Sequence, residues 1–147
     1  MICIKYSIGV TMVAGLVLAS VCGCRPSVGA TAVGTITIDG RPAPAGIRVD
    51  FEPQVKGASS STGYTDANGC YELMFNVNTV GVMPGESLVR LSIQPTFTGD
   101  GKPFMPEELR AIRLPDSVSR NSTLRQTVKP GANQIDIAVD TAAKGKP

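Results

Sequence analysis

Apolar and polar side chains alternate along much of the chain, and the clearest alternation follows a tight-turn signal. Asn68 and Gly69 both tolerate positive φ, so this dipeptide favours a type I′ turn. After it, Tyr71, Leu73 and Phe75 alternate with other residues, which is the pattern of an antiparallel strand with one buried face. The pattern therefore predicts a β-hairpin around residues 68–69.

Comparable alternations lie on both sides of this hairpin, separated by turn residues. Short strands without a long helical pattern predict an all-β domain, a seven-stranded antiparallel β-sandwich. The predicted strands are residues 33–39, 47–52, 61–66, 70–75, 89–93, 123–129 and 135–139. Their inward side chains form the predicted core, which consists of Ile36, Ile38, Val49, Phe51, Tyr71, Leu73, Phe75, Val89, Leu91, Ile135 and Ile137.

Residues 94–121 have little strand pattern and are rich in proline. Within them, Pro106–Arg110 predicts one or two helical turns, because proline suits the first helical position and Glu107 and Glu108 suit the first turn. A loop of this length in a compact domain is either functional or mobile.

The first 23 residues carry the pattern of an export signal. Ser7–Val21 is an uncharged, largely apolar run that follows Lys5. It is shorter than the roughly 20 apolar residues of a spanning helix, so a cleaved signal helix fits better than a permanent anchor helix. We therefore expect a signal peptide over residues 1–23, a tether over 24–31, the sandwich over 32–141 and a frayed tail over 142–147.

The segment Val21-Cys22-Gly23-Cys24 resembles a bacterial lipobox, with an aliphatic residue three before the cysteine and a small residue just before it. The resemblance implies cleavage before Cys24 and attachment of a diacylglycerol and an acyl chain such as palmitate. Two or more chains anchor a protein stably, at about 0.8 kcal/mol per buried methylene. Arg25 stands where an inner-membrane retention signal would carry Asp, so we expect attachment to the outer membrane, on its periplasmic or surface side.

Cleavage at this point would leave Cys70 without an internal disulfide partner in the mature chain. Export compartments permit disulfides, so Cys70 is either the site of an intermolecular link or an unreactive small residue on an exposed strand face. Loss of Lys5 with the signal reduces the 14 basic residues by one, against 12 acidic residues. A charge so closely balanced argues against nucleic acid or an acidic polymer as the partner.

With the strands placed, a series of segments resembles a known family. The segments are residues 33–42, 49–53, 65–73, 84–86 and 124–139. In this order and spacing they resemble the small bacterial lipoproteins built on a carboxypeptidase regulatory-like domain. The resemblance implies a prealbumin-like, Greek-key β-sandwich with no established catalytic activity. Ser87, Val118 and Gln126 depart from the family pattern, which places Tyr at the first two positions and an inward side chain at the third.

The composition removes several kinds of chemistry. The chain has no histidine, which excludes a Ser-His-Asp triad and a His-ligated zinc site. Asp66 and Asn68 resemble the start of a calcium loop, but Phe75 stands where that loop needs a glutamate. The open catalytic alternative is a carboxylate pair assembled by folding from acids in turns, namely Asp39, Asp66, Glu86 or Asp100. Solvent in turns keeps such groups near their ordinary pKa, so we expect no catalytic residue, cofactor or metal.

The sequence thus predicts a membrane-anchored lipoprotein of the cell envelope that acts as a non-catalytic binding or structural module, with an envelope protein or glycan as partner. The alternative is a carbohydrate-binding or enzyme-accessory domain that acts through the 94–121 loop. In that loop Phe97, Phe104 and Met105 are the apolar candidates for a ligand surface.

Overall fold

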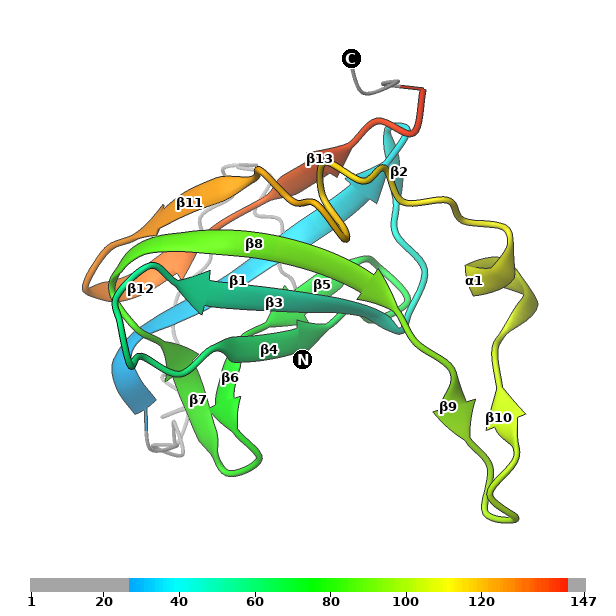
Figure 1. Cartoon of the computed structure of the whole chain (residues 1–147), viewed down its shortest axis with the longest axis horizontal. Coiled ribbons are helices and arrows are strands. Elements are labelled where there is room, and N and C mark those ends of the chain that lie inside the picture. The colour runs from blue at the N-terminus through cyan, green and yellow to red at the C-terminus, as the bar shows by residue number, and fades with distance from the viewer. Residues whose placement is uncertain (1–26, 143–147) are drawn as a thin grey trace, which may run out of the picture.

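The computed structural model describes residues 27–142, so the predicted signal peptide, Cys24 and residues 143–147 lie outside the described part. Within it the chain is mostly β with one short helix, and most strands join a single curled, mixed sheet that resembles half of a barrel (Figure 1). The predicted all-β class is confirmed at this level. The sheet is not clearly the seven-stranded antiparallel sandwich that the alternation predicted. No helix within residues 27–142 has the length and apolar character to cross a bilayer.

The elements follow one another in this order: β1 (Ser27–Ile38), β2 (Arg41–Pro42), β3 (Ile47–Pro53), β4 (Ser61–Tyr64), β5 (Cys70–Glu72), β6 (Met74–Asn76), β7 (Thr79–Val82), β8 (Gly85–Ile93), β9 (Thr96–Phe97), β10 (Pro103–Phe104), α1 (Glu107–Arg110), β11 (Arg125–Val128), β12 (Gly131–Gln134) and β13 (Ile137–Val139). Across the sheet the described strands run β11-β8-β3-β4-β6-β7-β1-β12, while β2, β5 and β13 also pair with β1. A separate ribbon is formed by β9 and β10.

The long strand β1 explains why the antiparallel expectation is wrong. It pairs in parallel with β7, β12 and β13, and antiparallel with β2 and β5. Residues 27–31, expected in the tether, are its first part and pair with β7 and β12. Gly34 allows this crowded arrangement, because a Cβ there would overlap the backbone carbonyl of Ile135.

Strands β3 and β8 form the longest antiparallel pair, with Ile47 opposite Ile93 and Pro53 opposite Ser87. Their alternate side chains behave as predicted: Val49, Phe51 and Leu91 are fully buried on the concave face. The opposite face is polar and ion-paired. The Arg48 Nε lies 2.9 Å from an oxygen of Asp50, and the Thr62 hydroxyl donates to Asp50 Oδ1 over 2.6 Å.

The turn at residues 66–70 exists, but it is not the type I′ turn of a regular hairpin. Within the described residues Asp39 is the only non-glycine residue with positive φ, so Asn68 does not adopt that conformation, whereas Gly69 does. Instead, Asp66 Oδ1 accepts the N–H groups of Asn68 and Cys70 at 2.8 and 2.9 Å, as an Asx-type turn does. Directly after the turn β5 pairs with β1, whereas β6 pairs antiparallel with β4, with Met74 opposite Thr62. A side chain therefore sets this turn, and the predicted hairpin is confirmed only in its later part.

Nine of the predicted core side chains are buried, and Ile38 is partly buried against them. Phe75 is the exception, because it is only half-buried and lies outside the residues that pack on the core. The physical reason is a register shift between Met74 and Asn76 in the β6–β7 pair, which breaks the alternation just before Phe75. The core also includes residues that the pattern did not nominate: Ala30, Ala32, Ala43, Val82, Leu109, Val128 and Val139.

Cys70 differs from its prediction in two respects. Its side chain is buried at 2% exposure, although the alternation placed it on the exposed face. Its sulfur is also disulfide-bonded.

Residues 94–121, called the excursion below, leave the sheet after β8 and return before β11. The β9–β10 ribbon projects away from the sheet, and α1 follows it on the same side of the molecule (Figure 1). The predicted helical turns are confirmed, with Pro106 at the N-cap and both acids in the first turn. Leu109 on α1 is buried at 4% exposure and belongs to the core, so it joins the excursion to the sheet.

Candidate functional site

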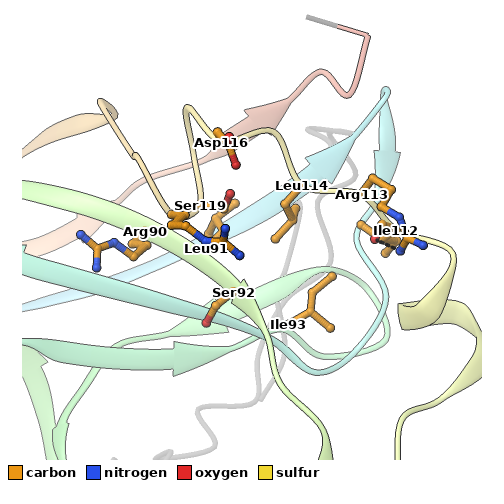
Figure 2. A pocket seen from close by; sticks show the side chains of 10 residues that line it. Arg90, Leu91, Ser92, Ile93, Ile112, Arg113, Leu114, Asp116 and Ser119 are labelled. Carbon is orange, nitrogen blue, oxygen red and sulfur yellow. Dashed lines mark hydrogen bonds between the residues drawn. The ribbon is translucent and has the colours of Figure 1, made fainter. Parts of the chain in front are cut away.

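A cleft of about 480 Å³ lies where the excursion returns to the edge of β8. One wall is the end of β8 from Arg90 to Ile93, and the other wall is the returning chain from Ile112 to Arg120 (Figure 2). Ligand sites for small molecules commonly have volumes of roughly 300–1,000 Å³. The cleft therefore has the size of a ligand site, and it is open to solvent.

Backbone hydrogen bonds hold the two walls together. The N–H of Leu91 donates to the carbonyl of Val118 over 2.7 Å, and the N–H of Val89 donates to the carbonyl of Leu124 over 2.8 Å. The Ser122 hydroxyl donates to the carbonyl of Val89. The pairing of β11 with β8 stops at Leu88, opposite Arg125. The hydrogen bonds of Val89 and Leu91 continue along the same edge of β8, so they fix the returning chain against the sheet.

A tight turn presents the polar residues of the second wall. The N–H of Val118 donates to the carbonyl of Pro115 over 3.1 Å, and the Ser119 hydroxyl donates to the same carbonyl over 2.8 Å. The N–H groups of Ser119 and Asn121 both donate to the carbonyl of Asp116, over 3.2 and 3.0 Å. The turn thus uses its own backbone groups in hydrogen bonds, and the Asp116 side chain lines the cleft.

The floor of the cleft is apolar. Leu91 is fully buried, while Ile93, Ile112 and Leu114 are partly buried against the core. In Figure 2 the side chains of Leu114 and Ile93 come from opposite walls and point toward one another. This floor offers a contact surface for an aliphatic group, because burying apolar area is favourable at about 25 cal/mol per Å².

The rim carries three arginines and one aspartate. Arg90 lies at one end of the cleft and Arg113 at the other (Figure 2). Arg90 Nη1 is 3.3 Å from Glu52 Oε1, whereas Arg113 Nη1 donates only to the carbonyls of Arg110 and Ile112, at 2.9 and 3.3 Å. Arg120 has no hydrogen-bond or ion-pair partner among the described residues. Among the described residues, Arg113 and Arg120 therefore have no carboxylate within salt-bridge distance, although Asp116 shares the rim with them.

Two buried donors also lie at this site without a partner in the described part of the chain. They are Arg90 Nε and the hydroxyl of Ser92. Leaving a buried donor unpaired costs about 1–3 kcal/mol, and buried polar groups normally find a partner. Both residues belong to the β8 wall of the cleft.

The apolar residues that the sequence nominated lie elsewhere. Phe97 and Phe104 are on the β9–β10 ribbon and are 71% and 51% exposed. Phe97 stands opposite Pro103 and Phe104 opposite Thr96, so the two rings occupy opposite faces of the ribbon. Met105 is partly buried against the core. The structure therefore does not bring these three side chains together on one surface.

The four acids considered for catalysis each have hydrogen-bond or ion-pair partners of their own. Thr141 donates to Asp39 from its N–H and its hydroxyl, at 2.9 and 2.7 Å, and these bonds lower the pKa of Asp39. Hydrogen bonds from Thr98 and Lys102 lower the pKa of Asp100. Asp66 closes its own turn, and Glu86 pairs with Arg125. Each acid is engaged by donors of its own neighbourhood.

Comparison with known proteins does not assign the chain to a family. A scan against protein-family models, a search of curated proteins and a search of solved structures each find no match. The assignment of function therefore depends on the cleft and on the sequence.

Sequence reasoning missed the polar residues of the cleft. The sequence contained one weak indication of a binding site. Arg113 and Arg120 lie in the excursion, where strand alternation does not explain their positions. The signal does not identify a site by itself. The wall forms only through the contact of Leu91 with Val118, which no local pattern encodes.

Proposed function

We propose that the mature chain is a lipid-anchored protein of the cell envelope whose folded part is a non-catalytic binding module. The observation that carries the binding role is the cleft beside β8, with its apolar floor and the guanidinium groups of Arg113 and Arg120. Its walls belong to a hydrogen-bonded sheet edge, and rigid elements position binding groups better than free loops do. The anchor is Cys24, on the argument of the lipobox.

A non-catalytic role is supported by the partners that the candidate acids already have. Proton transfer needs a group with a pKa near the working pH, and the hydrogen bonds at Asp39 and Asp100 move their pKa in the opposite direction. The test is a broad hydrolase panel on protein extracted from native membranes. Turnover that disappears on one Asp→Asn change, at Asp39, Asp66 or Asp100, would overturn the proposal.

We also propose kinship with the carboxypeptidase regulatory-like lipoproteins and their prealbumin-like sandwich. Support comes from the order of the sequence segments and from the alternating burial along β3 and β8. The parallel partners of β1 set this chain apart from a purely antiparallel sandwich. An experimental structure in which β1 has only antiparallel neighbours would favour the closer kinship.

The second candidate function is binding of a glycan through the β9–β10 ribbon, which the exposure of Phe97 and Phe104 favours. Because the rings face opposite sides of the ribbon, each would stack on a sugar alone. A glycan-binding screen of the parent protein and of Phe104→Ala tests this candidate. Binding that survives both Phe104→Ala and Phe97→Ala would exclude the ribbon as the site.

A lipid anchor on Cys24 and an internal disulfide at Cys70 exclude one another in the mature chain. Cleavage before Cys24 removes Cys3 and Cys22, and a thioether on Cys24 occupies the sulfur of the last remaining candidate partner. With this processing, a disulfide at Cys70 of the mature chain would have to join two molecules. Intact mass of the membrane-extracted protein distinguishes the two forms. We expect loss of residues 1–23 with a gain of acyl mass, and a full-length chain with an intramolecular disulfide would overturn the anchor.

A short tether follows from the same proposal. Ser27, the first described residue of β1, lies three residues after Cys24, and an extended residue spans at most about 3.6 Å. The N-terminal end of β1 would thus lie within about 11 Å of the acylated residue. Val77 is 91% exposed and lies at the same end, because Val80 of the parallel β7 stands opposite Ser27. We expect slower amide exchange at residues 76–80 when the acylated protein is on vesicles, and equal exchange on and off vesicles would contradict this orientation.

A further inference from the structure

We propose that the cleft between β8 and residues 112–120 binds a small monoanion with an aliphatic stem, such as a carboxylate. This inference rests on the proposed binding function and names its ligand class. The oxyanion would accept hydrogen bonds from the guanidinium groups that line the cleft, those of Arg113 and Arg120, and the aliphatic stem would cover Leu114 and Ile93. Each part of this arrangement follows from a separate feature of the cleft.

The anion is inferred from a contrast among the arginines. Arg48, Arg110 and Arg125 each face a carboxylate of Asp50, Glu107 and Glu86 respectively. Arg113 and Arg120 line the cleft and have no carboxylate within salt-bridge distance among the described residues. An arginine carries five N–H donors and no acceptor, and Arg113 directs only Nη1 at backbone carbonyls. Planar oxyanions are the acceptors that fit the remaining donors best.

The aliphatic stem is inferred from the floor. Ile93, Ile112 and Leu114 are held in place by the core on one side and line the cleft on the other. A fully ionic ligand such as inorganic phosphate would leave this apolar surface in water. A chain of a few methylenes would cover it, and the gain is about 0.8 kcal/mol for each methylene that is fully buried.

The restriction to a single negative charge is inferred from Asp116. This residue lines the cleft, and in Figure 2 it lies on the turn above Leu114. Like charges disfavour one another at short range. A dianion bound by Arg113 and Arg120 would therefore be penalised relative to a monoanion.

The test uses octanoate as the probe and follows binding to the full protein by calorimetry at low ionic strength. We expect saturable binding of octanoate and weaker binding of three comparison probes. Octyl phosphate carries a second charge, octyl glucoside carries none, and acetate lacks the stem. Octyl glucoside that binds as tightly as octanoate would overturn the role of the arginines.

Variants then locate the site. Arg120→Gln and Arg113→Gln are each expected to weaken octanoate about tenfold, the loss of one charge-assisted contact. Arg41→Gln is the matched control, because Arg41 is also exposed and has no ion pair among the described residues, but it does not line the cleft. Asp116→Asn should raise the affinity for octyl phosphate. All four side chains are exposed, so unchanged thermal unfolding confirms that each variant is folded.

Two results would overturn the proposal. One is the absence of saturable octanoate binding, and the other is an affinity that Arg113→Gln and Arg120→Gln leave unchanged. Neither result bears on the proposed lipid anchor at Cys24, because the intact mass of the protein tests that anchor independently. If octanoate does not bind and Cys24 is acylated, the ligand class is wrong and the anchored module remains. If octanoate binds and Cys24 is not acylated, the cleft stands and the envelope anchor is wrong.

Discussion

The β3–β8 pair and the excursion use the same kinds of side chain in opposite ways. In the pair, Phe51 is fully buried and Arg48 is paired with Asp50. In the excursion, Phe97 is 71% exposed and Arg120 has no partner among the described residues. Aromatic and cationic groups that stabilise the sheet are thus available for contact in the excursion. We infer that stability resides in the sheet and recognition in the excursion, with Leu109 as the main buried link between them.

The largest expected effect tests the sheet. Phe51→Ala should lower the free energy of unfolding by about 3–5 kcal/mol, because it removes a fully buried ring and leaves a cavity. Urea denaturation measures the change. Arg48→Ala, on the opposite face, should cost no more than about 1 kcal/mol, the range of an exposed ion pair. Equal losses at the two positions would mean that the two faces of the strand are not distinguished as described.

Leu109→Ala tests the link between the two regions. It should cost about 2–5 kcal/mol, the range for a buried leucine that is cut back to alanine. Amide exchange should then rise in residues 105–114 before it rises in β3 or β8. Uniform exchange across the protein would show that the excursion and the sheet unfold as one unit.

Tyr71→Phe removes a single buried hydrogen bond. The Tyr71 hydroxyl donates to the carbonyl of Ile135 over 2.7 Å, and its loss should cost about 1–2 kcal/mol because the carbonyl stays buried. Burial raises the pKa of the Tyr71 phenol well above its ordinary value.

Because the pKa of Tyr71 is raised, the stability difference between the parent protein and Tyr71→Phe should depend on pH. Folding favours the protonated phenol, so its contribution is fully present below about pH 10, the ordinary tyrosine pKa, and is lost as the pH rises above it. Unfolding curves at increasing alkaline pH should therefore converge for the parent and Tyr71→Phe. A stability difference that stays constant through this range would contradict the buried, protonated phenol.

The smallest expected effect lies in the excursion. Phe97→Ser should change the free energy of unfolding by no more than about 0.5 kcal/mol, because the ring makes little buried contact. The same chemical change at Phe51 provides the contrast. A loss of more than 2 kcal/mol at Phe97, by the measure that marks a buried site, would place that ring in a buried environment.

The sequence predicted the strands well where alternation is strong. Phe51 and Leu91 are buried because side chains two apart share a face. The predictions for the turn and for Phe75 failed for physical reasons that an alternating pattern of apolar and polar residues does not contain. Asp66 replaced the expected turn by accepting N–H groups with its side chain, and a register shift turned Phe75 away from the core.

The cleft was beyond sequence reasoning for a related reason. Its second wall depends on the contact between Leu91 and Val118, which joins residues that no local pattern connects. The exposed rings of the ribbon were a reasonable hypothesis from composition, but strand pairing put Phe97 and Phe104 on opposite faces. Composition indicates which side chains could form a binding surface, whereas the register of the paired strands decides which of them lie on the same face.

The position of β1 beside β12 and β13 has a consequence for the order in which the chain can fold. Thr35 donates from its N–H to Asp136, 101 residues later, and Ile36 stands opposite Ile137. The first strand therefore cannot complete its pairing until the last strands have been made. Pairings this distant in sequence close slowly, on the order of milliseconds to seconds. The sheet therefore closes only after the C-terminal strands have been synthesised, so the N-terminal half of the chain has to wait for its partners.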